Sequence, residues 1–458
     1  MALSAPSLES AATINPDGSR RFIHPATPRG LFTALRSVTG LLLLAIYAAL
    51  PWIPIKGHPA VFLDIADRRF HLFGLTLVMQ DLWLGFFLIT GTGFALFYLT
   101  ALFGRVWCGW VCPQTVFLDF IRRIERLIEG DAPKRRRLDA SQWTGMKTIQ
   151  RGLKQLLFAL FALALAHVFI SYFVSLPLLW KMMAQSPLEH WSAFVFVFAM
   201  AAALWFDFAW FREQFCIVLC PYGRLQSVLM DNDTITVGYD AGRGEPRGKK
   251  GAPGARDCID CFRCVQVCPT GIDIRQGAQI ECIACAACID ACDEVMVRLD
   301  RPTGLIRYDS ANGFAGKKTR FVRPRTIVYT ILLTIGALAA AFSVSTFQPA
   351  TVTVSRMIGE PYLLSGGLVR NQYMVRIINK QSRPEVFQLR MSGAAGLTTS
   401  GAEDLIPVAA LGEEIRPLVA MIPRAQFQSG MTVMIQVSSA DGHFHSEQAV
   451  PFLGPNSQ

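Results

Sequence analysis

Long apolar segments separated by polar loops dominate the chain up to residue 346. They occupy residues 35–54, 82–103, 153–175, 191–211 and 326–346. A segment of about 20 apolar residues is long enough to cross a hydrocarbon core of roughly 30 Å as a helix. The pattern therefore predicts five transmembrane helices.

After residue 350 the hydrophobic pattern changes from continuous apolar runs to alternating apolar and polar residues. Short alternating segments are separated by Gly, Pro and Asn; they read TVTVSRM, QYMVRIINK, VFQLRMSG, MTVMIQVSS and EQAVPFL. Period-two segments at regular spacing are typical of strands whose one face is buried. We expect a β-sandwich in this C-terminal region, without a disulfide because the region contains no cysteine.

Composition and charge agree with a membrane protein. Hydrophobic residues make up 52% of the 458 residues and charged residues 17%, far from the average of soluble domains. The formal net charge of +10 lies largely on loops that flank the apolar segments. There it sets topology and attracts anionic lipid, so membrane lipid is an expected partner and nucleic acid is not.

The distribution of basic residues predicts the orientation. The loop 104–152 holds ten arginines and lysines, whereas the loop 176–190 holds only Lys181. Because cytoplasmic flanks are enriched in Arg and Lys, we expect a multi-pass protein of the bacterial inner membrane with a cytoplasmic N-terminus and a periplasmic C-terminal domain. The polar segment before the first span is too long for a secretory signal, which predicts an uncleaved anchor.

These patterns divide the chain into five predicted regions. They are an N-terminal cytoplasmic segment, a four-helix membrane region with a repeated cysteine motif, a cytoplasmic cysteine-rich domain, a fifth membrane helix and a periplasmic β domain, at 1–34, 35–235, 236–325, 326–346 and 347–458.

All twelve cysteines fall between residues 108 and 292, on the predicted cytoplasmic side. Thiols stay reduced there and more often bind metals or carry out redox chemistry than form disulfides. Eight of them form two runs, CIDCFRCVQVCP at 258–269 and CIACAACIDACD at 282–293. Each run has the spacing Cys-x-x-Cys-x-x-Cys-x-x-x-Cys.

This spacing is typical of a ferredoxin-like domain with two [4Fe-4S] clusters. Three thiolates on a tight loop reach three irons of one cluster, and the fourth ligates the other cluster. We expect cluster one to use Cys258, Cys261, Cys264 and Cys292, and cluster two to use Cys282, Cys285, Cys288 and Cys268. Structural zinc is the alternative, but it has no use for a crossed fourth cysteine. Asp293 stands where the second run would usually have a proline, which removes no ligand.

The remaining four cysteines form two Cys-x-x-x-Cys-Pro pairs, WCGWVCPQT at 107–115 and FCIVLCPYG at 215–223. Each pair follows an apolar segment, and cysteines four apart share one face of a helix. The proline cannot continue the helix normally, so we expect a kink or a restart. Three interpretations remain: Cys108, Cys112, Cys216 and Cys220 hold or reduce copper, they cycle between dithiol and disulfide, or they are buried small residues.

Several segments together resemble the FixG/CcoG family, also called RdxA. They are RRFIHPATPRGLF, DIADRRFHLFGLTLVMQD, RGEPRG, GIDIRQGAQIECIACAACIDACDEVM and the two cysteine–proline pairs. The resemblance implies a polyferredoxin-like core, an immunoglobulin-like C-terminal domain and a role in assembling cbb3-type cytochrome oxidase. It also implies reduction of Cu(II) to Cu(I) at the four paired cysteines, which would make the protein a cupric reductase. Expected partners are oxidase subunits or copper chaperones and transporters, together with a cytoplasmic electron donor.

Two other functions stay open. The protein could be a quinol dehydrogenase subunit similar to NapH or NosR, which share the cysteine–proline and ferredoxin motifs. It could also be a non-catalytic assembly scaffold whose clusters sense redox state. Reoxidation of reduced clusters by Cu(II) and not by quinone would favour copper reduction over both of these alternatives.

Overall fold

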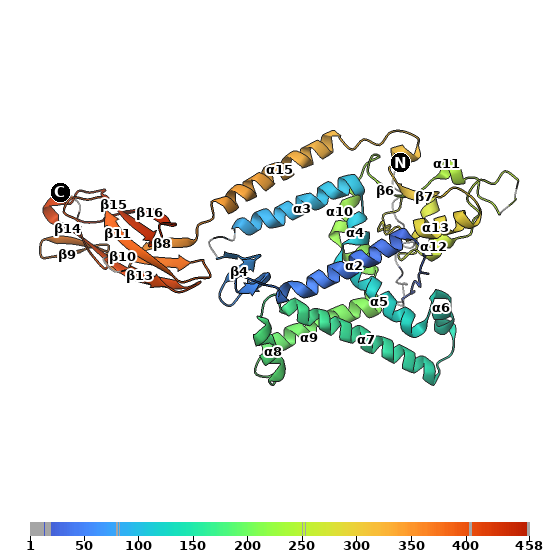
Figure 1. Cartoon of the computed structure of the whole chain (residues 1–458), viewed down its shortest axis with the longest axis horizontal. Helices are drawn as coiled ribbons and strands as arrows, with labels where there is room; N and C mark the ends of the chain where they lie inside the picture. The colour runs from blue at the N-terminus through green and yellow to red at the C-terminus, as the bar shows by residue number, and fades with distance from the viewer. Residues whose placement is uncertain are drawn as a thin grey trace. The chain divides into compact units, whose positions relative to one another are not determined.

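The computed structural model describes residue 13 and residues 20–78, 81, 83–249, 251, 253–402 and 405–455 (Figure 1). The chain forms two compact units. One holds the chain up to Ile53 together with Gly85–Ala339, and the other holds Pro54–Leu84 together with the chain from Ala340.

Among the described residues, five helices are long and apolar enough to cross a membrane, and they match the five predicted apolar segments. They are α2 (Leu31–Ala49) with the 3-10 turn η1 (Leu50–Trp52), α3 (Trp83–Phe103), α7 (Gly145–Ile170), α9 (Trp191–Phe206) and α15 (Pro324–Ser345). Helix α7 begins before its apolar segment because the Thr144 hydroxyl caps it, accepting a hydrogen bond from the Lys147 N–H at 3.3 Å.

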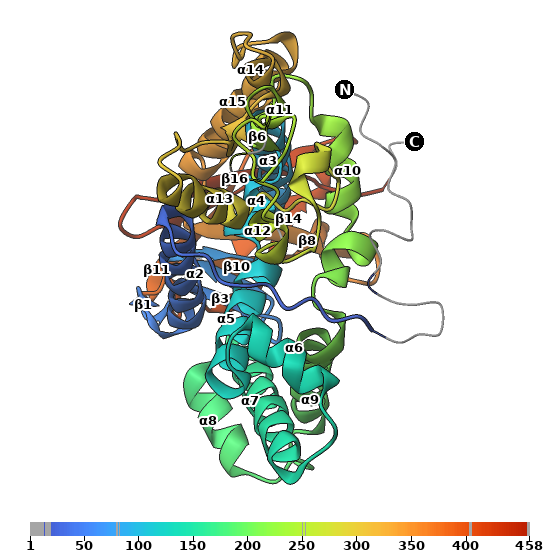
Figure 2. The same cartoon turned by 90° about the vertical axis from the view of Figure 1, so that its right-hand side faces the viewer.

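Shorter helices follow the membrane helices of the first unit. They are α4 (Val106–Trp110), α5 (Pro113–Glu129), α6 (Ala132–Ala140), α8 (Leu176–Ala184), the π-helical turns η3 (Asp207–Phe211) and η4 (Phe215–Leu219), and α10 (Pro221–Leu229). The apolar face of α5 packs Leu118 and Ile121 against Phe158 of α7. Helices α7 and α9 lie side by side (Figure 2).

The cysteine-rich region of the first unit is built on a two-stranded antiparallel sheet. Strand β6 (Thr236–Tyr239) pairs with β7 (Ile306–Asp309). Between and after these strands lie α11 (Ala241–Gly244), α12 (Arg263–Gln266), the 3-10 turn η5 (Ile274–Gln276), α13 (Ala287–Arg298) and α14 (Ala311–Phe314). Helix α13 packs against α2.

The part of the second unit that follows Ala340 contains two antiparallel sheets among its described residues. One has the order β12-β14-β10-β8 with β9 added to β10, and the other has the order β13-β11-β15-β16. The strands are β8 (Ala350–Arg356), β9 (Leu363–Ser365), β10 (Leu368–Asn379), β11 (Glu385–Ser392), β12 (Thr398–Ser400), β13 (Leu405–Val408), β14 (Glu413–Pro423), β15 (Thr432–Ser439) and β16 (His445–Pro451). Val375, Leu389 and Leu418, each fully buried, belong to one core between the sheets. The five alternating segments of the sequence correspond to β8, β10, β11, β15 and β16.

The loop between the first two spans also belongs to the second unit. It forms β1 (Pro54–Ile55), β2 (His58–Pro59), β3 (Val61–Asp64), β4 (Arg69–Leu72) and β5 (Leu75–Leu77). Strands β3, β4 and β5 make a three-stranded sheet. The buried ammonium of Lys380 lies 2.7 Å from a carboxylate oxygen of Asp81, which joins this loop to the C-terminal sheets.

Candidate functional site

The two cysteine runs adopt the same backbone conformation. Asp260 and Phe262 of the first run have φ values of 56° and 56°, and Ala284 and Ala286 of the second run have 53° and 61°. These residues occupy equivalent positions between the first three cysteines of each run. Left-handed backbone is unfavourable for residues with a side chain, so its repetition indicates a loop shape that the bound group requires.

Each loop leads into a short helix. Helix α12 begins after Phe262 and contains Cys264, and α13 begins after Ala286 and contains Cys288. Helix α12 ends before Cys268, which Pro269 follows, whereas α13 continues through Cys292 to Arg298. The absence of a proline after Cys292 accounts for the greater length of α13, since proline in a helix interior removes a hydrogen bond.

The fourth cysteine of each run lies beside the first three cysteines of the other run. Burial, together with the nearby Cys264, Cys258 and Cys261, raises the pKa of Cys292 to about 12. Burial likewise raises the pKa of Cys282 to about 12, with Cys268 and Cys285 adding to the effect. The structure therefore brings together the two crossed sets that the spacing predicts.

The second set lines a cavity that suits an iron–sulfur cluster. Its wall contains Cys268, Cys282, Cys285 and Cys288 together with Cys264 of the first set, and apolar side chains such as Ile274 fill most of the rest. Four convergent thiols in an apolar cavity are the donor set of a [4Fe-4S] cluster, in which each iron takes one cysteine. The residues present fit that group.

The two cysteine–proline pairs also share one geometry. Cys112 and Cys220 are the N-cap residues of α5 and α10, with ψ values of 126° and 111°, and Pro113 and Pro221 are the first helical residues. Proline suits this position because its missing N–H would have no partner in the first turn. The chain therefore restarts a helix after each pair. Cys108 lies in the α-helical turn α4 and Cys216 in the π-helical turn η4.

All four paired cysteines are close to one another. Burial, together with the nearby Cys112, Cys108 and Cys220, raises the pKa of Cys216 to about 12. Burial also raises the pKa of Cys108 to about 12, partly offset by Arg105. At neutral pH these two thiols are protonated when no metal is bound, so a metal ion that binds them displaces protons.

The surroundings of Cys112 also favour a negatively charged sulfur. Burial raises its pKa, but the backbone N–H groups of Gln114 and Thr115 at the start of α5 donate to the sulfur and counteract that effect. Within the described ranges, no three His, Cys, Asp or Glu side chains are arranged around a single metal ion. Binding of one soft ion such as Cu(I) by more than two of the four thiolates would therefore require the side chains to move.

Polar contacts between the two repeats hold the pairs together. On α10, the Gln226 amide donates to the Gly104 carbonyl at 2.8 Å, and the Cys108 sulfur lies 3.8 Å from the Gln226 carbonyl oxygen. On α5, the Gln114 amide donates to both carboxylate oxygens of Asp207, at 3.0 and 2.8 Å. The helix that follows each pair thus contacts the chain that precedes the other pair.

Helix α4 is in direct contact with the second cysteine loop. A Cβ atom on Gly109 would lie 2.5 Å from the Ile283 carbonyl oxygen and 2.9 Å from the Cys285 nitrogen, so only glycine permits this approach. Cys108 packs in the same apolar cluster as Cys285 and Cys288. The first cysteine pair therefore borders the second set of cluster ligands.

A hydrogen-bonded bridge runs beside this contact. The Trp110 indole N–H donates to the Tyr308 hydroxyl at 3.0 Å, and that hydroxyl donates to the Ala284 carbonyl at 2.6 Å. Burial raises the pKa of Tyr308 well above its ordinary value. The phenol thus stays neutral and keeps its proton as a donor.

Helix α13 is fixed to the start of the first membrane helix by Asp290. Its buried carboxylate accepts hydrogen bonds from the backbone N–H groups of Phe32 and Thr33, at 3.2 and 2.6 Å, and from the Thr33 hydroxyl at 2.6 Å. Gly30 leaves room for the carboxylate, which lies where a Cβ would be. Asp290 thereby caps α2 from another part of the chain.

Replacing Asp290 by alanine is expected to lower the free energy of unfolding by about 2 kcal/mol, because it removes a buried cap from two backbone N–H groups and the Thr33 hydroxyl. Thermal unfolding of the detergent-solubilised chain measures the loss. Glu294→Ala is the matched control, since that carboxylate lies on the same helix and pairs with an exposed arginine. An equal loss in both variants would contradict the capping role.

Sequence reasoning did not find Gly109, Asp290 or Gln226, three residues that position the site. Only Gly109 carried a signal, because a glycine between two cysteines of a helical turn indicates a close backbone approach. Asp290 and Gln226 resemble ordinary helix surface residues in the sequence. Their partners lie far along the chain, at separations of 257 and 122 residues.

Comparison with known protein families agrees with this geometry. A family described as 4Fe-4S dicluster domain matches residues 211–311, and one described as 4Fe-4S binding domain matches residues 84–130. The family that describes the IG-like fold at the C-terminal of FixG matches residues 340–455. The last match confirms the immunoglobulin-like β region.

Individual relatives extend the similarity over most of the chain. Protein RdxA of Cereibacter sphaeroides is 38% identical over 84% of this chain and 87% of its own length. Nitrogen fixation protein FixG of Rhizobium meliloti is 33% identical over 83% of this chain and 80% of its own length. Ferredoxin-type protein NapH of Escherichia coli is 26% identical over 42% of this chain and 60% of its own length.

The paired cysteine loops and the C-terminal β-sandwich lie within the residues that the dicluster family and the FixG C-terminal family match. The chain therefore belongs to the FixG/RdxA family of membrane-associated 4Fe-4S electron-transfer proteins.

Proposed function

We propose that this protein delivers electrons to copper, reducing Cu(II) to Cu(I) for the assembly of a cbb3-type cytochrome oxidase. The observation that carries the proposal is the contact between the two sets of cysteines. Gly109 lies against the backbone of Ile283–Cys285, and Cys108 packs with Cys285 and Cys288. Because these cysteines are already in contact, a cluster and a copper ion held by them could exchange an electron without movement of the protein.

In this proposal two [4Fe-4S] clusters occupy the two crossed cysteine sets. When bound, the clusters supply single electrons at potentials that the protein tunes through charge and hydrogen bonds. Cys258, Cys261, Cys264 and Cys292 would hold the first, and Cys282, Cys285, Cys288 and Cys268 the second. The second set borders the paired cysteines, so its position makes it the exit for electrons.

Cys108, Cys112, Cys216 and Cys220 would hold the copper ion. Thiolates favour the reduced ion, so binding at these sulfurs raises the tendency of Cu(II) to accept an electron. Each Cu(II) takes one electron and becomes Cu(I), and the thiols that bind it give up their protons. The N–H groups at the start of α5 stabilise the resulting negative charge on Cys112.

The proposal also implies on which side of the membrane copper is reduced. Copper would be reduced on the cytoplasmic side of the inner membrane, where the basic loops indicate that all twelve cysteines lie. A cytoplasmic donor would supply the electrons, and copper chaperones or transporters would receive Cu(I). The immunoglobulin-like domain would then lie in the periplasm, where it could contact oxidase subunits.

The similarity to NapH supports a second candidate function, a quinol dehydrogenase subunit. The match to NapH covers less than half of this chain. In that case quinone, and not copper, would exchange electrons with the clusters. If the protein were a scaffold, neither copper nor quinone would accept electrons from the clusters.

The choice is tested with anaerobic protein whose clusters have been chemically reduced. Cu(II) or a soluble quinone is added while cluster absorbance is followed, and a chelator captures Cu(I). We expect Cu(II) to reoxidise the clusters, with one captured Cu(I) for each electron lost, and quinone to leave them reduced. Reoxidation by quinone alone would favour the quinol function, and reoxidation by neither would favour the scaffold.

A further inference from the structure

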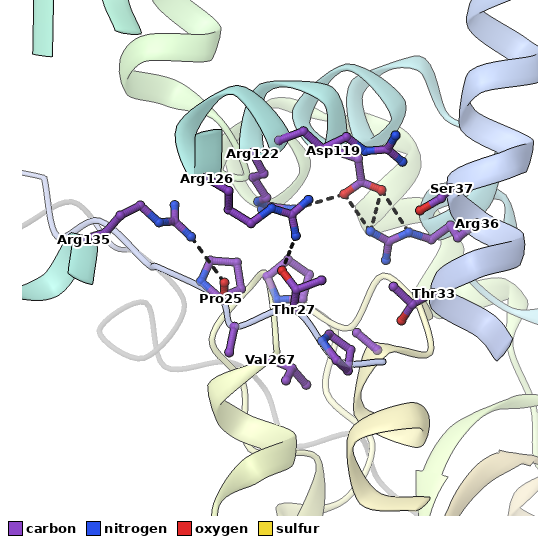
Figure 3. Close-up of a pocket in the computed structure, with 15 residues that line it drawn as sticks. Pro25, Thr27, Thr33, Arg36, Ser37, Asp119, Arg122, Arg126, Arg135 and Val267 are labelled. Atoms are coloured by element: carbon purple, nitrogen blue, oxygen red, sulfur yellow. Dashed lines mark hydrogen bonds and ion pairs between the residues drawn. The ribbon is translucent and has the colours of Figure 1, made fainter. Parts of the chain in front are cut away.

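A pocket rich in arginine lies between the segment before α2, the first turns of α2, helix α5 and the cysteine loops (Figure 3). Five arginines line it: Arg36 of α2, Arg135 of α6, and Arg122, Arg123 and Arg126 of α5. Among the lining residues that the structure describes, Asp119 is the single carboxylate. The pocket therefore carries an excess of positive charge.

Three of the five arginines have carboxylate partners. Arg36 donates to both oxygens of Asp119, with contacts at 2.6 and 2.9 Å. Arg122 pairs with Glu213, and Arg135 pairs with the buried Glu125 at 2.8 Å. These side chains are fixed in place and neutralised.

Arg123 and Arg126 form no ion pair within the described part of the chain. The Arg126 guanidinium donates to the Thr27 hydroxyl. Burial lowers the pKa of Arg126, and the positive charge of Arg123 lowers it further. Asp119 and Asp131 are near enough to Arg126 to raise its pKa and so offset part of this effect, but neither forms an ion pair with it. Two neighbouring, partly buried guanidinium groups without an ion-pair partner form a site for an anion.

The pocket lies at the level of phospholipid headgroups. Arg36 and Ser37 of α2 line it, and after Arg36 no charged residue occurs before Lys56. The hydrocarbon core must therefore begin within about one turn of Ser37. Basic groups just outside that boundary meet the phosphates of anionic lipids.

We propose that this pocket binds a phosphate group, with Arg123 and Arg126 as its charged donors. Guanidinium groups match phosphate oxygens in pairs, and the Ser37 hydroxyl offers a further donor beside them. The depth of the pocket favours a phospholipid headgroup as the source of the phosphate, and a soluble phosphate is the alternative source.

The bound phosphate would act on the neighbouring cluster, an effect that rests on the proposed function. Val267, Pro269 and Ala287 form part of the pocket wall, and each is adjacent in sequence to Cys268 or Cys288. Reduction adds one electron to the group held by these cysteines. A negative charge in the pocket opposes that addition and lowers the reduction potential of the second cluster.

The test compares two double variants of the full chain, each of which removes two positive charges. Arg123→Gln with Arg126→Gln alters the pocket, and Arg136→Gln with Arg137→Gln alters two exposed arginines of α6 that do not line it. Each protein is reconstituted in nanodiscs of phosphatidylcholine and phosphatidylglycerol, and retained lipid is counted by native mass spectrometry. Lipid retention can be measured whether or not clusters are present, so its result is independent of the proposed function.

We expect the control to retain phosphatidylglycerol as the wild type does, and the pocket variant to retain it roughly tenfold less. Arg123→Lys with Arg126→Lys should restore most of the retention, which shows that charge and not folding was lost. Displacement of the lipid by inorganic phosphate would identify a soluble anion as the source, and persistence would identify the lipid. Equal retention by the pocket variant and the control would overturn the proposal.

A redox titration followed by electron paramagnetic resonance tests the effect on the cluster. The midpoint potential of one cluster should rise in the pocket variant and stay unchanged in the control. An unchanged potential in a variant that has lost its phosphate would overturn the coupling between the pocket and the cluster.

Discussion

Replacing Cys108, Cys112, Cys216 and Cys220 together by serine is expected to abolish Cu(I) formation by the reduced protein. Serine oxygen is a harder and far less acidic ligand than thiolate, so the variant loses both affinity for Cu(I) and the route for the electron. The four residues do not belong to the crossed sets assigned to the clusters. Iron, sulfide and cluster absorbance should therefore stay at wild-type levels.

Variants of single pairs serve as internal controls for this result. Because each thiol lies close to the other three, Cys108→Ser with Cys112→Ser should lose nearly as much activity as the quadruple variant. The same holds for Cys216→Ser with Cys220→Ser. If either pair alone supports the full rate, the four cysteines do not form one site. If the quadruple variant reduces copper as fast as the wild type, copper accepts electrons elsewhere.

Replacing Gly109 by alanine is expected to slow copper reduction about 100-fold while leaving all twelve cysteines in place. The added methyl would lie 2.5 to 3.0 Å from backbone atoms of Ile283, Ala284 and Cys285, which cannot turn away as a side chain would. Helix α4 must therefore move away from the cysteine loop. Displacements of about 1 Å at a reacting centre cost about two orders of magnitude in rate.

Gly152→Ala is the matched control for this variant. Gly152 lies in helix α7, where an added Cβ meets no atom within 4 Å. Alanine there should stabilise the helix slightly and leave the rate unchanged. Single-turnover reoxidation of the clusters by Cu(II) measures the effect in both proteins. A wild-type rate in Gly109→Ala would show that electrons do not cross at this contact.

Local signals in the sequence predicted the parts of this molecule, because those signals depend on neighbouring residues. The length of each apolar run gave the five spans, and the spacing of the cysteines gave the two loops with matching backbone. The prolines at 113 and 221 predicted where helices restart. The alternation after residue 350 predicted five of the strands, although β14 was missed because Pro417 and its charged neighbours interrupt the pattern.

The sequence did not predict how those parts are arranged, because the contacts that determine the arrangement follow no periodic pattern of residues. The duplication of the cysteine–proline motif indicated that two pairs could meet, but the contacts of Gln114 and Gln226 that join the repeats were not visible. The charges of the loop between the first two spans nearly balance and gave no strong signal of its orientation. Its short strands, which belong to the second unit, were not predicted.

The cap on the first membrane helix has a consequence for how the protein is made. A chain is synthesised from its N-terminus, so α2 enters the membrane long before Asp290 leaves the ribosome, 257 residues after Thr33. Until then the first N–H groups of α2 have only water as partner. The start of the first span therefore acquires this cap only after the second cysteine loop has been synthesised and has brought Asp290 beside it.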